Sequence, residues 1–284
     1  MQMWLSAIRL LLGPLLLLQG AKVRRDILRM PEPEGPRTGR SGQGNGLSVL
    51  LLGDSSIAGV GAQTQDQALS GRLAHRLATT HQVNWQVIGT TGWTTQDALD
   101  AIAARPSRKI DIAVLSLGVN DVTTETGIRQ WLQSYDHLIE TLRRDWQPRR
   151  IILSGLPPMG AFPALPQPLR WYMGQQASAH ERALFKHFGQ DPDIVCLPLA
   201  LDLDVSAMAE DGFHPGPQVY HVWAEDIARV IQRQSQTPPA PPAPATDAAH
   251  PSSETEPSSE RSRNPAPSDP RQPARTRPDP AGFP

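Results

Sequence analysis

Ser48-Val49-Leu50-Leu51-Leu52-Gly53-Asp54-Ser55-Ser56 is an apolar run of strand length that ends in a polar turn. The run is rich in branched residues and apolar at successive positions, which is typical of a parallel strand buried on both faces. A serine at the end of such a strand, just before a helix or turn, points its hydroxyl into the crevice beyond the sheet. Ser55 is therefore a candidate nucleophile, although Gly-Asp-Ser alone also describes an ordinary turn.

Four further apolar runs follow along the chain, and stretches with helical periodicity separate them. This alternation predicts a mostly parallel five-stranded sheet, with helices on both faces and right-handed crossovers. The predicted strands are 48–52, 85–88, 110–117, 150–153 and 193–197, and the predicted helices are 68–79, 95–104, 127–146, 169–188 and 217–232.

Two loops at the carboxyl ends of the second and third strands carry candidate donors to a negatively charged oxygen. Gly92 lets a ligand approach the backbone closely, so that its N–H can serve as an oxyanion donor. Asn120 can donate to the same oxygen through its side-chain amide. Each residue also has a simpler interpretation: Gly92 as part of a turn, and Asn120 or Asp121 as a helix N-cap.

The segment Asp211-Gly212-Phe213-His214-Pro215 lies just before the last predicted helix. An acid and a histidine three residues apart on a short turn can point the same way. The carboxylate then orients the imidazole, which accepts a proton from a serine. Pro215 restricts His214 to an extended backbone, which helps to hold the ring. Taken alone, the segment also fits a surface turn with an N-terminal proline.

Four turns at one edge of the predicted sheet thus carry a nucleophile, two oxyanion donors and an acid–base pair. This set resembles the SGNH/GDSL hydrolase family, whose named serine, glycine, asparagine and histidine correspond to Ser55, Gly92, Asn120 and His214. Asp211 stands at the aspartate position of the family, and the resemblance covers roughly residues 47–233. It departs at Ser56, where the GDSL name has leucine.

The resemblance implies a three-layer α/β/α flavodoxin-like fold and hydrolysis of esters or thioesters without a metal or cofactor. It implies a catalytic triad of Ser55, Asp211 and His214, and an oxyanion hole formed by Ser55, Gly92 and Asn120. It also covers carbohydrate acetyl esterases, and transfer of the acyl group to an alcohol stays open. A different class of function is a catalytically inactive fold used as a tethered scaffold, with the proline-rich tail as its working part.

A long apolar loop follows the fourth predicted strand, and an aromatic residue adjoins Gly92. Trp93, Met159 and Phe162 are candidates for the wall of an acyl or aryl pocket. The alternative is that they pack the loop onto the domain. If they line the site, small apolar acyl or aryl esters are favoured over sugars as substrates.

Residues 1–20 form an apolar segment that fits a membrane anchor, a signal-like leader or an interfacial helix. The basic residues Lys22, Arg24, Arg25 and Arg29 follow it. By the positive-inside rule they would hold the domain on the cytoplasmic side. We expect association with a membrane and leave the side open. Residues 21–46, rich in proline, glycine and arginine, are predicted to be a linker.

Residues 234–284 are rich in proline and polar residues and contain almost no large apolar side chain. This composition predicts a disordered tail. The formal net charge of −1, with acidic and basic residues interspersed, gives no electrostatic case for nucleic acid as a partner. No zinc, P-loop or dinucleotide motif is present. A small-molecule ester is the expected partner, and the sequence does not indicate an oligomeric state.

Overall fold

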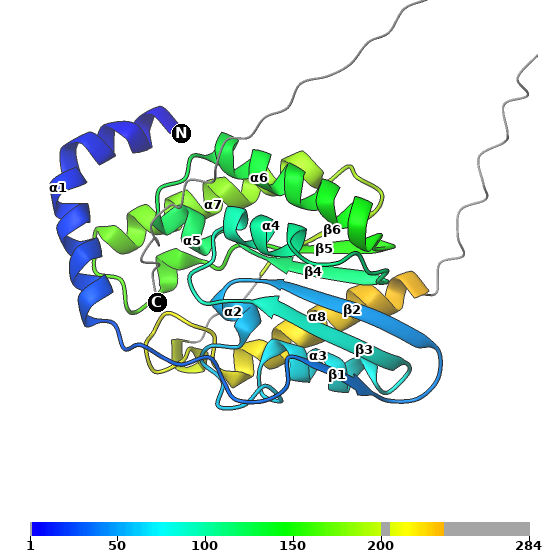
Figure 1. Ribbon diagram of the computed structural model, residues 1–284. Coiled ribbons are helices and arrows are strands. Elements are labelled where there is room, and N and C mark those ends of the chain that lie inside the picture. Colours follow the sequence, from blue (N-terminus) through cyan, green and yellow to red (C-terminus); the bar gives the residue numbers. More distant parts are fainter. Residues whose placement is uncertain (1, 200–204, 236–284) are drawn as a thin grey trace, which may run out of the picture.

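The computed structural model describes residues 2–199 and 205–235, and nearly all of the predicted tail lies outside the described residues. A six-stranded sheet forms the centre of the molecule, with the strand order β1-β3-β2-β4-β5-β6 (Figure 1). The mostly parallel sheet is confirmed, but it has six strands and not five. The strands are β1 (Thr38–Ser41), β2 (Gly46–Gly53), β3 (Gln82–Gly89), β4 (Ile112–Ser116), β5 (Arg150–Ser154) and β6 (Ile194–Leu197).

The additional strand, β1, lies in the segment predicted to be a linker, so that prediction is wrong for these residues. β1 pairs antiparallel with β3 and forms one edge of the sheet, whereas the other five strands pair in parallel. At Gly39 a Cβ would lie only 2.6 Å from the ring of Trp85. A four-residue edge strand that is only half-buried needs no apolar run, which is why composition did not reveal it.

The sheet is the middle layer of an α/β/α arrangement. Alternate residues of β2 point to opposite faces: Leu50 and Leu52 join the core beneath one helical layer, and Val49 and Leu51 join the core beneath the other. Helices α4, α6 and α7 cover the first face, while α3 and α8 cover the second (Figure 1). The predicted three-layer fold is confirmed.

The helices follow the predicted order. The predicted helix 127–146 ends in a single π turn, after which Gln147 adopts a left-handed conformation with φ of 47°. The α-helices are α1 (Gln2–Asp26), α2 (Ser55–Ala58), α3 (Leu69–Leu77), α4 (Thr95–Ala103), α5 (Val119–Thr123), α6 (Ile128–Thr141), α7 (Leu169–Phe188) and α8 (Pro217–Ser235); η1 (Leu142–Trp146) is the π turn, and η2 (Met159–Ala161) and η3 (Val205–Ala207) are 3₁₀ turns.

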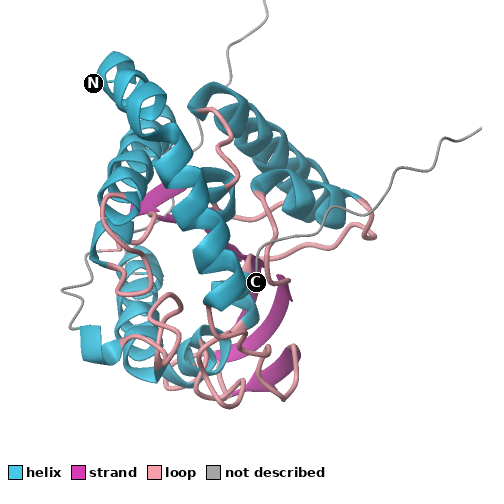
Figure 2. Cartoon of the chain, turned by 90° about the vertical axis from the view of Figure 1, so that its left-hand side faces the viewer, coloured by secondary structure: helices cyan, strands magenta, loops and turns pink. Residues whose placement is uncertain are grey.

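Helix α1 extends beyond residue 20, where the apolar segment was predicted to end, and it packs against the domain beside α7 (Figure 2). Leu16 and Val23 are buried in the core. The side chain of Gln19 donates to the carbonyl oxygen of Gln167 at 2.8 Å and accepts from the N–H of Leu169 at 3.1 Å. Within the described residues, no helix has both the length and the hydropathy needed to span a bilayer.

Strand β2 lies between β3 and β4. The chain connects β2 to β3 on one side and then crosses to β4 on the other side, so β2 marks the point where the strand order reverses. Such a switch point opens a crevice at the carboxyl ends of the two strands that flank it. Helix α2 begins directly after β2, and α5 begins shortly after β4. The fold therefore brings Ser55 and Asn120 to the same edge of the sheet.

Candidate active site

Ser55 is the first residue of α2 and follows β2 after a single intervening residue. Asp54 caps this short helix, because its carboxylate accepts from the N–H of Ser56 at 3.0 Å. Gly59 ends the helix in the left-handed conformation, with φ of 97°. The N–H of Ser55 lies in the first turn, where the helix itself provides no acceptor. Both the hydroxyl and the N–H of Ser55 therefore lie at the crevice beyond the carboxyl end of β2.

His214 connects Ser55 to Asp211 through a continuous line of hydrogen-bonding atoms. His214 Nε2 lies 3.0 Å from Ser55 Oγ, and His214 Nδ1 lies 2.5 Å from Asp211 Oδ2. The other carboxylate oxygen of Asp211 accepts from the N–H groups of Phe213 and His214, both at 2.9 Å. All three side chains are largely buried. The residues predicted to form a triad are therefore brought together in the order serine, histidine, aspartate.

The environment of Asp211 favours its charged form. Burial raises the pKa of the carboxyl group, but the hydrogen bond and positive charge of His214, with the two backbone N–H groups, outweigh this effect. The pKa of Asp211 is lowered as a result. A carboxylate that stays ionised can hold the imidazole in one tautomer and can stabilise the imidazolium.

Ser56, the neighbouring hydroxyl, belongs to a different network. Its Oγ donates to Asp54 Oδ1 at 2.8 Å and lies 3.2 Å from Ser116 Oγ at the end of β4. Burial raises the pKa of Asp54, although its bonds from Ser56 act in the opposite direction. The contacts of His214 therefore single out Ser55, and not Ser56, as the serine beside the base.

Asn120 lies in the first turn of α5, but it is not the N-cap, because Gly118 occupies that position. The buried amide of Asn120 donates one N–H to the carbonyl oxygen of Trp93 at 2.9 Å, and an amide has a second N–H to offer. Gly92 has φ of 86°, a left-handed conformation that favours glycine. The bond to Trp93 thus ties the two candidate oxyanion donors to each other.

Two residues of the segment predicted to be a linker hold the loop that carries Gly92. Glu32 accepts from the N–H of Thr91 at 2.8 Å and from its hydroxyl at 3.0 Å. Arg37 forms an ion pair with Glu32 and donates to the carbonyl oxygen of Gly89 at 2.6 Å. Sequence reasoning missed both residues. The only signal was a group of acidic and basic residues within a proline-rich stretch, and that pattern does not indicate a partner so distant in sequence.

A cavity of about 50 Å³ adjoins Ser55 and His214, and Phe162 lines it, as predicted for the pocket wall. Phe213 lines it too, with its ring centroid 5.2 Å from that of Phe162. Met159 does not line this cavity: the turn η2 places its side chain in the core, where it is fully buried. Trp93 packs half-buried against the same core and contributes its carbonyl oxygen to Asn120.

The geometry can be compared with known proteins. The profile of the GDSL-like Lipase/Acylhydrolase family matches residues 51–222, which include Ser55 and the turn that carries His214. The chain belongs to this family. This GDSL-like hydrolase accordingly acts on ester bonds. A comparison with curated proteins gives no match.

Solved structures with the same fold include other proteins described as lipolytic. The lipase Lip_vut3 from a goat rumen metagenome is 18% identical, with a TM-score of 0.51 over 64% of this chain and 96% of the lipase. A member of the lipolytic G-D-S-L family from Veillonella parvula is 15% identical, with a TM-score of 0.51 over 66% and 99% of the two chains. A carbohydrate acetylesterase family member from Sinorhizobium meliloti is 17% identical, with a TM-score of 0.50 over 66% and 98%. At these identities the likeness shows the fold of the GDSL-like hydrolase.

Proposed function

We propose that this GDSL-like hydrolase cleaves carboxylic esters or thioesters through Ser55, with His214 as general base and Asp211 as the residue that orients it. The observation that carries the proposal is the buried line of atoms from Ser55 Oγ through the imidazole to Asp211 Oδ2, with contacts of 3.0 Å and 2.5 Å. A serine hydroxyl is a weak nucleophile unless an adjacent base accepts its proton. His214, in contact with Ser55 Oγ, is the base that we assign to this role, and Asp211 is the group that we assign to hold it.

In the first half of the reaction, Ser55 Oγ attacks the carbonyl carbon of the ester while His214 Nε2 accepts the hydroxyl proton. The tetrahedral intermediate then collapses, the bond to the leaving oxygen or sulfur breaks, and the imidazolium gives that atom its proton. In the second half, a water molecule gives a proton to His214 and attacks the acyl-enzyme. Collapse returns the proton to Ser55 Oγ and releases the acid.

Negative charge develops on the former carbonyl oxygen in both halves. The N–H of Ser55, the N–H of Gly92 and the second amide N–H of Asn120 are the donors that we assign to this oxygen. The three residues follow the carboxyl ends of β2, β3 and β4, respectively. Donors fixed in place before the charge appears stabilise the transition state more than the ground state.

The proposed substrate places a small apolar acyl or aryl group in the cavity beside Ser55. The cavity beside Ser55 has a volume of only about 50 Å³, and Phe162 and Phe213 form part of its wall. An apolar wall favours such groups over a sugar. The same chemistry leaves two alternatives: transfer of the acyl group to a second alcohol, and cleavage of carbohydrate acetyl esters.

Covalent labelling tests the nucleophile directly. A fluorophosphonate probe should label the wild-type protein at Ser55 and should label Ser56→Ala equally, whereas Ser55→Ala should stay unlabelled. Labelling that persists in Ser55→Ala would overturn the assignment. A panel of nitrophenyl esters, with glycerol or sugars added as acceptors, distinguishes hydrolysis from acyl transfer through the products formed.

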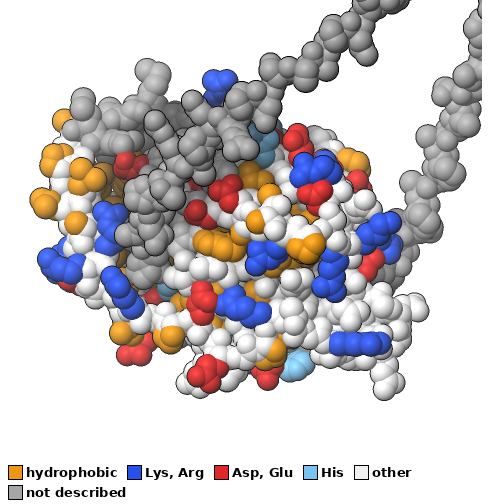
Figure 3. Space-filling model, in the orientation of Figure 1, with side chains coloured by type: hydrophobic (Ala, Val, Ile, Leu, Met, Phe, Trp, Pro, Cys, Tyr) orange, Lys and Arg blue, Asp and Glu red, His pale blue; other side chains and the backbone are white. Residues whose placement is uncertain are grey.

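We also propose that the protein attaches to a lipid surface through α1. Leucines on this helix are strongly exposed, at 79% for Leu11 and 70% for Leu18. Four basic residues follow these leucines along the chain: Lys22, Arg24, Arg25 and Arg29. Figure 3 shows apolar and basic side chains side by side at this end of the molecule. Exposed apolar residues beside cations suit an anionic bilayer.

Sedimentation with vesicles tests this attachment. The full chain should sediment with phosphatidylserine-containing vesicles more than with neutral ones, and a Leu11→Ser/Leu18→Ser variant should sediment less. Val222→Ser, which alters an exposed apolar residue on α8 instead, is the matched control and should behave as wild type. Equal sedimentation of the leucine variant and the wild type would contradict the proposal.

A further inference from the structure

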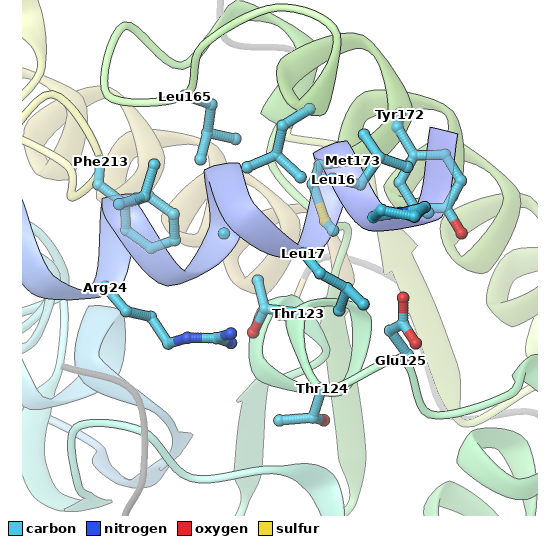
Figure 4. A pocket seen from close by; sticks show the side chains of 15 residues that line it. Leu16, Leu17, Arg24, Thr123, Thr124, Glu125, Leu165, Tyr172, Met173 and Phe213 are labelled. Carbon is cyan, nitrogen blue, oxygen red and sulfur yellow. The ribbon is translucent and has the colours of Figure 1, made fainter. Parts of the chain in front are cut away.

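A groove of about 610 Å³ runs between α1 and the body of the domain, beside the cavity at Ser55. One wall comes from α1 and the opposite wall from the loop before α7 and from α7 itself, and the end of α5 forms part of the floor (Figure 4). Its volume falls within the range of ligand sites in proteins, roughly 300–1,000 Å³. The apolar lining residues include Leu16, Leu17, Leu165, Leu169 and Met173.

The groove adjoins the candidate active site at Phe213. This residue lines both the groove and the cavity beside Ser55. Its ring centroid lies 5.3 Å from that of His214, the group that exchanges protons with the reacting oxygen. A single side chain thus stands between the two spaces, and a chain attached to the reacting ester has to extend only past Phe213 to enter the groove. The small cavity alone has no room for such a chain.

The wall formed by α1 is firmly placed. Gln19 bonds to the backbone on both sides of Pro168, and Leu16 and Val23 are buried against the domain. Two glycines of the helix, Gly13 and Gly20, face the groove. A Cβ added at Gly13 would meet no atom within 4 Å, and one added at Gly20 would meet only the end of Arg24, at 3.9 Å. The missing side chains thus contribute open space to the groove.

We propose that this groove binds the unbranched alkyl chain of the ester substrate, with α1 as its outer wall. The proposal rests on the proposed function, since it assigns a site to part of the same substrate. Helix α1 lies outside the segment that the family profile matches, so this wall belongs to the chain's own N-terminal extension. Alkyl chains reach the groove from either side of the ester bond, as the acyl part or as the alcohol part.

The proposal predicts how activity depends on chain length. Each buried methylene strengthens binding by roughly threefold to fourfold. For the full-length wild-type protein, kcat/KM should therefore rise over several methylenes in at least one of two series: nitrophenyl esters of acids from acetate to dodecanoate, and acetate esters of alcohols from ethanol to dodecanol. The series that responds identifies the side of the ester that occupies the groove.

Gly13→Leu and Gly20→Leu test the wall itself, because a leucine side chain at either position fills part of the groove. In the series that responds to chain length, kcat/KM for the longest ester is divided by kcat/KM for the shortest ester. Each variant should lower this ratio by about tenfold or more. Gly46→Leu is the matched control: it is exposed at the start of β2, at the other end of the sheet, and its Cβ would meet no atom within 4 Å. Its ratio should equal that of the wild type.

The outcomes separate this proposal from the proposed function. A wild-type protein that cleaves short esters through Ser55 but gains nothing from longer chains in either series overturns the groove as a chain site and leaves the nucleophile in place. An unchanged ratio in Gly13→Leu and Gly20→Leu overturns the assignment of α1 as a wall of the chain site. Absence of all ester turnover, with no labelling of Ser55, overturns the proposed function instead.

Discussion

The hydroxyl of Tyr220 donates a hydrogen bond to the carbonyl oxygen of Val60 at 2.6 Å. Val60 follows the short helix that begins with Ser55, and Tyr220 lies in α8 shortly after His214. The bond therefore joins the segment that carries the candidate nucleophile to the segment that carries the base. Tyr220 is completely buried, and burial raises its pKa well above the ordinary value, so the phenol stays protonated and able to donate.

Tyr220→Phe should lower the free energy of unfolding by about 1–3 kcal/mol, because it leaves a buried carbonyl oxygen without its donor. Urea denaturation measures this loss. Tyr172→Phe is the comparison: among the described residues, the hydroxyl of Tyr172 accepts from the half-buried side chain of Gln176, and its removal should cost less. Equal stabilities of wild type and Tyr220→Phe would show that the bond joining the two segments adds nothing to the fold.

Ser55→Ala and His214→Ala should each abolish ester turnover, and the double variant should be scarcely worse than either single one. The reason is that the two side chains act as a unit across their 3.0 Å contact. Asp211→Asn should keep the fold and lose activity less completely, because the amide cannot stabilise the imidazolium. Single-turnover rates with a nitrophenyl ester measure these effects. Strictly additive losses from Ser55 and His214 would contradict a shared mechanism.

Asn120→Ala should reduce kcat by about 10²–10³ with little change in KM, the effect of removing one oxyanion donor. Steady-state kinetics on a short ester give both constants. The bond from Asn120 to Trp93 also holds the loop, so the thermal stability of the variant is measured in parallel. If only the stability falls and kcat is unchanged, Asn120 serves the loop and not the oxyanion.

Glu32→Ala should reduce kcat by up to about a hundredfold, because the loop that carries Gly92 loses both bonds from Thr91 and a shift of 1 Å in such a loop is costly. Glu32→Gln keeps an oxygen that accepts from Thr91 and should recover most of kcat. Glu34→Ala, which removes an exposed carboxylate nearby, is the control. A Glu32→Gln variant as impaired as Glu32→Ala would assign the effect to the ion pair with Arg37.

Asp121→Asn should change the pH dependence of stability. Burial is the main cause that raises the pKa of Asp121 to about 6, despite its bonds from the N–H and hydroxyl of Thr95. The folded state thus binds this proton more tightly than the unfolded state, in which the pKa is about 3.9. The contribution of Asp121 to stability is greatest below pH 4 and declines, by up to about 3 kcal/mol, as the pH rises through 6.

The asparagine variant cannot lose a proton, so its stability relative to wild type should improve between pH 4 and pH 7. Denaturation at both pH values gives the difference. Asp66→Asn, at an exposed position, should show no such trend. A relative stability of Asp121→Asn that falls with rising pH would reverse the sign and contradict the buried, proton-binding carboxyl group.

The sequence was sufficient to predict the parallel sheet because its strands are buried on both faces. Continuous apolar runs such as 48–52 indicate that burial. It was also sufficient to predict that Ser55, Asp211 and His214 lie close together, because each follows or precedes a strongly patterned element at the same edge of the sheet. The spacing of Asp211 and His214 within one turn made their contact predictable before any coordinate was known.

The N-terminal segment was not predictable in the same way. Strand β1 pairs with residues far away in the chain, and so do Glu32 and Arg37, which bond to the loop that carries Gly92. A local hydrophobic periodicity does not indicate such long-range contacts. Helix α1 is apolar on most sides, so its pattern did not reveal which face packs on the domain. Met159 was misplaced for a related reason, since an apolar loop residue fits a pocket wall and a core equally well.

Ser55 and His214 touch although 159 positions separate them in the chain. A ribosome that adds about 5–20 residues per second would complete the serine's helix roughly 10–30 s before it adds the histidine. On the proposed mechanism, the emerging polypeptide has the nucleophile during that interval but lacks the base. Attack on esters near the site of synthesis therefore has to wait until the segment that carries His214 has been made and has reached Ser55.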